Sequence, residues 1–152
     1  MRKLFILLAL FVSMTMMAEK TWVDLGLPSG TLWASEPEEG YFFYEEAVDS
    51  FGINLPTKWQ WEELLQSCAM DRDEEGNIVL KSKNGESLVL PTRGWIYKNG
   101  KVMNSVCGYF QTFNNFDKKN AWYAFVSFPS QPDHMLWALK DSYKMSVLLV
   151  DK

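Results

Sequence analysis

The sequence predicts an α+β domain in which two short helices are followed by a series of short antiparallel strands. Helical periodicity is confined to residues 44–68, whereas the chain after residue 78 consists of apolar runs separated by polar turns. Two of those turns contain Asn-Gly, at positions 84–85 and 99–100, a pair that strongly favours a β-hairpin. Helices early and antiparallel strands later are together typical of the α+β class.

Residues 1–18 have the three-part pattern of a secretory signal peptide. Arg2 and Lys3 give a basic start, residues 4–12 are almost wholly apolar, and the segment ends in the small residue Ala18. The apolar run is shorter than the roughly 18–20 residues that cross a bilayer. We therefore expect cleavage after Ala18 and export to the periplasm, the cell surface or the medium. The mature chain, residues 19–152, is expected to be one domain that does not insert into a membrane.

Charge and aromatic content limit the classes of partner. Loss of Arg2 and Lys3 with the leader changes the formal net charge from −4 to −6. An acidic chain with no Lys/Arg cluster in its sequence is not expected to bind nucleic acid. All seven tryptophans lie in the mature part. The core is the usual destination of such side chains, but surplus exposed rings in exported proteins stack on sugars or on partner surfaces.

The first strands are predicted from turn signals. Residues 22–23 and 32–34 are expected to pair, because Pro28 and Gly30 lie between them in a segment that suits a tight turn. After a second turn, residues 41–43 are predicted to form a short strand.

The two helices follow. Residues 44–51 are predicted to form a helix that ends at Gly52. Thr57 is a helix N-cap, and Gln60 three residues later completes a capping box. The helix that starts there is expected to bury one face, made by residues at helical spacing: Trp61, Leu64, Leu65 and Cys68.

The rest of the chain is predicted to be strands and turns. The strands are expected at residues 78–80, 87–90, 95–97, 102–103, 106–113, 121–128, 135–139 and 146–150. Within 121–128 the side chains alternate, yet both resulting faces are rather apolar. That strand is therefore expected to have few polar side chains on either face.

Cys68 and Cys107 are the two cysteines of the chain. In an oxidising compartment they can form a disulfide, which would close a loop of about 40 residues and contribute roughly 3–4 kcal/mol. The alternative is two buried free thiols, since cysteine is among the most buried residue types. Both alternatives remain open at this point.

Several segments resemble one bacterial family of secreted domains. Residues 22–35, WVDLGLPSGTLWAS, resemble the opening signature of the Fibrobacter succinogenes major paralogous domain. Residues 55–65 resemble the helix of that family that starts with Leu-Pro-Thr, and residues 84–91 resemble its Asn-Gly strand. Shorter matches at residues 108–110 and 146–150 extend the likeness over the mature chain.

The resemblance implies a C-type-lectin-like fold, similar to that of the formylglycine-generating sulfatase-modifying proteins, with two helices of the N-terminal half packed on irregular antiparallel sheets. Two segments depart from the family. Where the family usually has a longer loop that contains Cys-Asn-Gly-Ala, this chain has the short segment of residues 36–40. Where the family tends to have Trp-Ser-Ser, this chain has residues 110–112, Phe-Gln-Thr. The paired reactive cysteines that formylglycine-generating chemistry requires near the C-terminus have no counterpart in Cys68 and Cys107.

Two further segments match incomplete ion-binding motifs. Residues 71–76 match the first half of an EF-hand loop, but Ser82 occupies the position of the bidentate Glu. Gln131-Pro132-Asp133 matches a tripeptide of some C-type lectins, without the Trp-Asn-Asp motif that accompanies it. His134 is the only histidine. We interpret these segments as turns and loops, and expect no metal, no cofactor and no catalytic residues.

The remaining candidate ligand-binding residues are Gln111, Asn114, Asn115 and Trp122. Amides beside an aromatic ring can hold a sugar through paired hydrogen bonds and stacking, but the same residues also form turns beside a core tryptophan. We predict an exported, non-enzymatic module that binds a glycan or a cell-surface protein. The alternatives are a structural or assembly subunit without a small-molecule ligand, and a degenerate relative of the formylglycine-generating enzymes.

Overall fold

The computed structural model describes residues 20–151 except 130 and 132. The predicted signal peptide, residues 1–18, lies outside this part. The described chain is mixed α+β, as predicted, and strands outnumber helices. Its helices are α2 (Tyr44–Phe51), the 3₁₀ turn η1 (Gly52–Asn54) and α3 (Lys58–Ser67).

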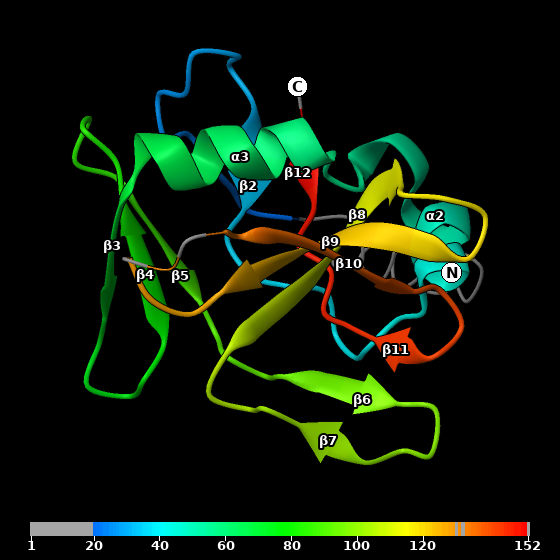
Figure 1. Cartoon of the computed structure of the whole chain (residues 1–152). Helices are drawn as coiled ribbons and strands as arrows, with labels where there is room; N and C mark the ends of the chain where they lie inside the picture. Colours follow the sequence, from blue (N-terminus) through cyan, green and yellow to red (C-terminus); the bar gives the residue numbers. More distant parts are fainter. Residues whose placement is uncertain (1–19, 130, 132, 152) are drawn as a thin grey trace, which may run out of the picture.

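The strands of the described residues form four small antiparallel sheets of three strands each. In the order of neighbouring strands, the first sheet is β1 (Trp22–Val23), β2 (Leu32–Ala34) and β12 (Val150–Asp151), and the second is β3 (Ala69–Arg72), β4 (Ile78–Lys81) and β5 (Ser87–Leu90). The third sheet is β10 (Met135–Leu139), β9 (Asn120–Val126) and β8 (Gly108–Asn115). The fourth is β11 (Tyr143–Lys144), β6 (Trp95–Tyr97) and β7 (Val102–Met103). Figure 1 shows α3 and the β6–β7 hairpin on opposite sides of the molecule.

Both predicted helices are confirmed, and α3 has the predicted capping box. Thr57 Oγ1 accepts a hydrogen bond from the amide of Gln60 at 3.1 Å, and Gln60 Oε1 accepts one from the amide of Thr57 at 2.8 Å. These bonds satisfy N–H groups that have no partner inside the helix. Trp61 and Leu64 are fully buried on the expected face. The capping box therefore fixes where the most deeply buried helix residues begin.

The strands of the structure differ from the predicted ones in several places. Strand β3 was not predicted, because Asp71 and Arg72 break the apolar pattern; it pairs with β4, and the Arg72 side chain donates to Ser127 O at 2.7 Å. β11 was also not predicted. Residues 41–43 form only a bridge, between Phe42 and Met145.

The predicted strand at 146–150 is wrong in extent. Ser146 forms a single parallel bridge with Phe110, and the strand itself starts only at Val150. Val147, Leu148 and Leu149 are all buried, and the carbonyls of Val147 and Leu149 accept hydrogen bonds from the amides of Glu38 and Ala34. This segment is apolar because it crosses the core, and its backbone bonds go to loops as well as strands.

The main core is centred on three aromatic rings from three elements. Trp61 of α3 contacts Trp33 of β2 with ring centroids 4.8 Å apart, and Phe110 of β8 with centroids 5.0 Å apart. All three side chains are fully buried. Edge-on and tilted ring contacts at such distances are favourable beyond the area they bury. The rings therefore join the helix to two separate sheets.

A second, smaller cluster lies on the other face of the β8–β9–β10 sheet. Along β9, Ala124 and Val126 point into the main core, whereas Tyr123 and Phe125 belong to the second cluster with Cys107, Tyr109 and Met145. Alternation along the strand produces this separation. Strands β6 and β11 supply Trp95 and Tyr143 to cover the second cluster. The sheet thus separates the two clusters.

Substitution of Gly94 tests how closely the backbone before β6 packs against the backbone at the end of β7. Its φ is +65°, and a Cβ built there would lie 2.0 Å from the carbonyl oxygen of Met103. Gly100 has a φ of +87° with open space around it. Gly100→Ala should cost only the backbone strain of about 1–2 kcal/mol, whereas Gly94→Ala should cost a further ~1–3 kcal/mol of overpacking. Urea unfolding of the mature chain measures both losses, and equal losses would contradict the described contact.

Candidate functional site

Two of the predicted ligand-binding amides hold the fold together. Gln111 is only 3% exposed, and its Nε2 donates to the carbonyl of Phe42 at 2.8 Å and to that of Tyr143 at 3.4 Å. Asn114 Oδ1 accepts a hydrogen bond from the amide of Lys58 at 2.8 Å, at the start of α3. Both side chains therefore satisfy backbone groups of neighbouring segments.

The other two predicted residues, Trp122 and Asn115, have different surroundings. Trp122 is half-buried, with Phe116 and Trp137 against its ring at centroid distances of 5.4 Å each, and Lys58 Nζ lies 4.5 Å from its ring centroid. Asn115 is exposed at the end of β8. The structure does not gather the four predicted side chains around one cavity.

The two cysteines are free thiols in the structure, which is the second of the two alternatives. Cys68 ends α3 in the main core, and burial raises the pKa of its thiol. Cys107 belongs to the second cluster, with Sγ 3.3 Å from Ser127 Oγ. The β8–β9–β10 sheet carries residues of both clusters on opposite faces.

The side chains of the two incomplete ion motifs serve as turn and loop contacts. Asp73 Oδ1 accepts the amides of Glu75 and Asn77 at 3.0 and 2.9 Å. Gln131 Nε2 donates to the carbonyls of Phe125 and Asp133, at 2.7 and 2.9 Å. Pro132 lies outside the described residues. Short polar side chains that bond their own backbone in this way stabilise turns and loops.

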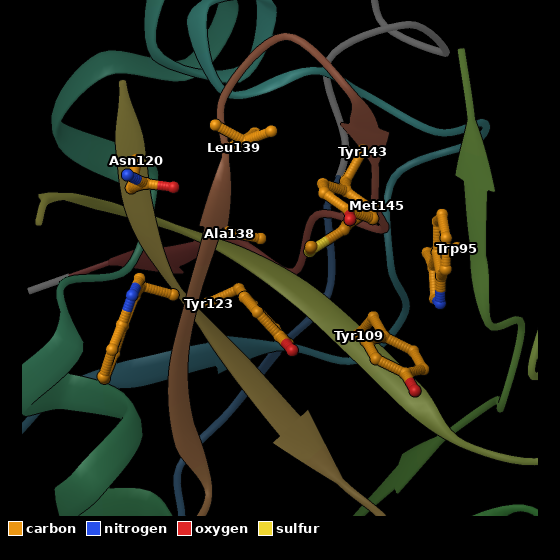
Figure 2. Close-up of a pocket in the computed structure, with 9 residues that line it drawn as sticks. Trp95, Tyr109, Asn120, Tyr123, Ala138, Leu139, Tyr143 and Met145 are labelled. Atoms are coloured by element: carbon orange, nitrogen blue, oxygen red, sulfur yellow. The ribbon is translucent and has the colours of Figure 1, made fainter. Parts of the chain in front are cut away.

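A pocket of about 360 Å³ lies between the second face of the β8–β9–β10 sheet and the strands β6 and β11. Figure 2 shows the rings of Trp95, Tyr109, Tyr123 and Tyr143 in one part of the pocket, with Asn120 and Leu139 toward the upper left of the view. Its lining residues are Trp95, Tyr109, Asn120, Tyr123, Trp137, Ala138, Leu139, Tyr143 and Met145. We refer to this cavity as the aromatic pocket.

The rings of the aromatic pocket pack against one another. Trp95 and Tyr143 meet edge to face with centroids 4.7 Å apart, and Tyr109 and Tyr123 are stacked at 5.8 Å. The hydroxyl of Tyr109 accepts a hydrogen bond from Asn104 Nδ2 at 2.6 Å. Mutual packing of this kind holds the rings in fixed positions, so the pocket is formed before any ligand arrives.

The phenol groups of Tyr109 and Tyr123 stay neutral over the physiological range. Burial, together with the nearby phenols of Tyr109 and Tyr143, raises the pKa of Tyr123 to about 12. Burial likewise raises the pKa of Tyr109. Among the described residues, no side chain or backbone group hydrogen-bonds the hydroxyl of Tyr123 or Tyr143. Both hydroxyls can therefore donate to and accept from a polar ligand.

The sequence does not predict this pocket, because its wall comes from five strands that are far apart in the chain. One feature of the sequence does indicate a second covered face. The segment 121–128 has two rather apolar faces, and Tyr123 and Phe125 alternate with the core residues Ala124 and Val126. A strand with aromatic residues on both faces needs a cover on each side.

No family model, no curated protein and no solved structure matches this chain. Within residues 20–151, no helix has the length and apolar character of a membrane span. The same part of the chain contains no grouping of three or more His, Cys, Asp or Glu side chains suited to a metal ion.

The ionisation of Tyr123 can be measured directly. Its pKa in the folded protein, about 12, lies above the ordinary value of about 10, so the neutral phenol adds stability that is complete below pH 10. This stability should be lost as the pH rises from about 10 toward 12. An ultraviolet titration should show one tyrosine ionising near pH 12, absent in Tyr123→Phe. Persistence of that late transition in the variant would assign it to another residue.

Proposed function

We propose that this protein is an exported, non-enzymatic binding module whose aromatic pocket holds part of a glycan. The observation that carries the proposal is a pre-formed concave site that combines ring faces with neutral hydroxyls. Its volume of about 360 Å³ lies within the range of small-ligand pockets, about 300–1,000 Å³.

The chemistry of a pyranose suits these groups. One side of the sugar ring presents C–H groups that pack on an aromatic face, and its hydroxyls both donate and accept hydrogen bonds. Tyr123 and Tyr143 supply hydroxyls without protein partners in the described chain. A sugar that enters the pocket would satisfy these hydroxyls and bury the rings of Trp95 and Tyr109.

The residues that line the pocket favour binding over catalysis. The nine lining residues include no Asp, Glu, His, Lys or Cys. General acid–base catalysis works best with a group whose pKa lies near the working pH, and the pKa of Tyr123 is about 12. The pocket therefore offers contacts, and we assign no reaction to it.

We also propose membership of the Fibrobacter succinogenes major paralogous domain family and a C-type-lectin-like fold. Two motifs support this proposal by their place in the structure. The opening signature forms β1, a turn and β2, and the Leu-Pro-Thr segment leads into the capping box of α3. Crystal coordinates with a topology unlike that of C-type lectins would remove the fold proposal and leave the pocket in place.

The glycan proposal is tested with a glycan array and calorimetry on the mature protein. Tyr123→Phe keeps the ring and removes a hydroxyl, so affinity for the bound glycan should fall about three- to tenfold. Tyr97→Phe is the matched control, because Tyr97 packs on Trp95 and Tyr143 but does not line the pocket. Equal affinities of the two variants, or no glycan bound by the unaltered protein, would contradict the proposal.

A second candidate function is self-association, favoured by a group of partly exposed rings that we call the aromatic ledge: Phe116, Trp122 and Trp137, the last of which also lines the aromatic pocket. Phe116 and Trp137 stack with centroids 4.3 Å apart and an interplanar angle of 9°. Their side chains are nevertheless 44% and 50% exposed. Large apolar side chains grouped on a surface mark interaction sites, and a second copy of the chain presents an equivalent ledge.

Light scattering after size exclusion tests the ledge. If a dimer forms through it, Trp137→Ala should shift the mass toward the monomer, because the variant removes the ring that stacks on Phe116. Phe128→Ala is the control, since Phe128 is 47% exposed but lies beyond the opposite end of β9. A monomer at all concentrations would exclude this second function.

A further inference from the structure

We propose that the glycan bound by this protein is anionic, and that a lysine-rich cleft beside the aromatic pocket binds its carboxylate or sulfate group. This inference rests on the proposed function and specifies the ligand class for the same site.

The cleft has a volume of about 540 Å³. Its lining residues are Glu45, Lys98, Lys118, Lys119, Leu139, Lys140, Asp141 and Ser142. Four lysines against two carboxylates make the lining positive, although the whole chain has a formal net charge of −4. Apart from the adjacent pair Lys118 and Lys119, these lysines are far apart in the sequence, and the fold brings them together. We call this cavity the lysine cleft.

The lysine cleft and the aromatic pocket adjoin each other. Leu139 lines both cavities, Asn120 in the pocket follows Lys119 in the cleft, and Tyr143 in the pocket follows Ser142 in the cleft. Hydrogen bonds hold the shared border together. The amide of Lys98 donates to Ser142 O at 3.2 Å, and the amide of Lys140 donates to Lys119 O at 2.8 Å. One ligand of two or three sugar units can therefore occupy both cavities.

A rigid turn presents two of the lysines. Asp117 Oδ1 accepts hydrogen bonds from the amides of Lys119 and Asn120, at 2.8 Å each, and from Asn120 Nδ2 at 3.0 Å. These bonds lower the pKa of Asp117 and hold its carboxylate on its own turn. Lys118 and Lys119 lie within this turn and are exposed. Asp117 thus fixes the backbone that carries two cationic side chains.

No carboxylate of the described chain pairs with the ammonium groups of the cleft, although Lys98 Nζ lies 5.8 Å from the ring centroid of Tyr97 and Lys140 Nζ lies 5.1 Å from that of Tyr44. In the described chain the ion pairs are Lys20–Glu38 and Lys58–Glu62, so Lys98, Lys118 and Lys119 are in none. Lys140 Nζ donates to the neutral carbonyl of Lys118 at 3.2 Å. Of the two carboxylates, Asp141 Oδ1 accepts the hydroxyl of Ser142 at 3.1 Å.

An anionic sugar derivative suits this pair of cavities. A uronate or a sulfated sugar keeps the C–H face that packs on a ring, and adds a charge at the edge of that ring. Each exposed ion pair adds modestly to affinity, so three lysines together are expected to change the dissociation constant by about tenfold at low salt. The aromatic pocket supplies shape, and the lysine cleft selects for charge.

The experiment uses matched glycans that differ in charge. The probes are an oligogalacturonate and its methyl ester, chondroitin sulfate and unsulfated chondroitin, and a neutral cello-oligosaccharide, each measured by calorimetry at low and high salt. The cleft variant is the triple substitution Lys98→Gln/Lys118→Gln/Lys119→Gln. The control removes the same charge from exposed lysines that do not line the cleft: Lys81→Gln/Lys83→Gln/Lys101→Gln.

Under this proposal at least one charged probe binds about tenfold more tightly than its less charged match, and salt reduces the difference. The cleft variant loses this preference and the control keeps it. Equal binding of charged and neutral probes, or a preference that survives in the cleft variant, overturns the anionic assignment while the glycan function stands. If the protein binds none of the probes but binds other, neutral glycans on the array, the anionic assignment again fails alone. No binding to any glycan overturns both.

Discussion

The structure depends on one constraint: the β8–β9–β10 sheet has apolar and aromatic side chains on both faces, and each face needs its own cover. α3 and the segment around Leu148 cover one face, where Trp61 packs on Phe110. On the other face, the short strands β6 and β11 supply the rings that cover the second cluster. Because this second cover is small, the rings beneath it are not fully closed off. The aromatic pocket is the space that the smaller cover leaves open.

The main core is held by ring packing with few polar contacts. The indole N–H groups of Trp33 and Trp61 are both buried and have no hydrogen-bond partner in the described chain. Each such group costs about 1–3 kcal/mol. The cost is offset by the burial of two complete indole rings and their contact at 4.8 Å. The second cluster differs, because its phenols reach the pocket and keep their hydrogen-bonding capacity.

Local signals in the sequence predict the elements well and the site poorly. Thr57 and Gln60 predict the start of α3, since a capping box is decided by residues three apart. β3 was missed because its partner strand and the Arg72 contact with Ser127, not its own pattern, hold it in place. Gln111 illustrates the limit for sites: an amide that binds a carbonyl of its own chain reads the same in sequence as one that binds a sugar. The pocket and the cleft arise from strands and turns that meet only after folding.

The β6–β7 hairpin has a consequence for how this protein can diversify. Its one ring in the pocket, Trp95, packs in the second cluster and makes no contribution to the main core. Substitutions in the hairpin therefore reshape one wall of the cavity while the Trp33–Trp61 packing stays unchanged. The shape of this cavity is therefore set by a different part of the chain from the one that sets the main core.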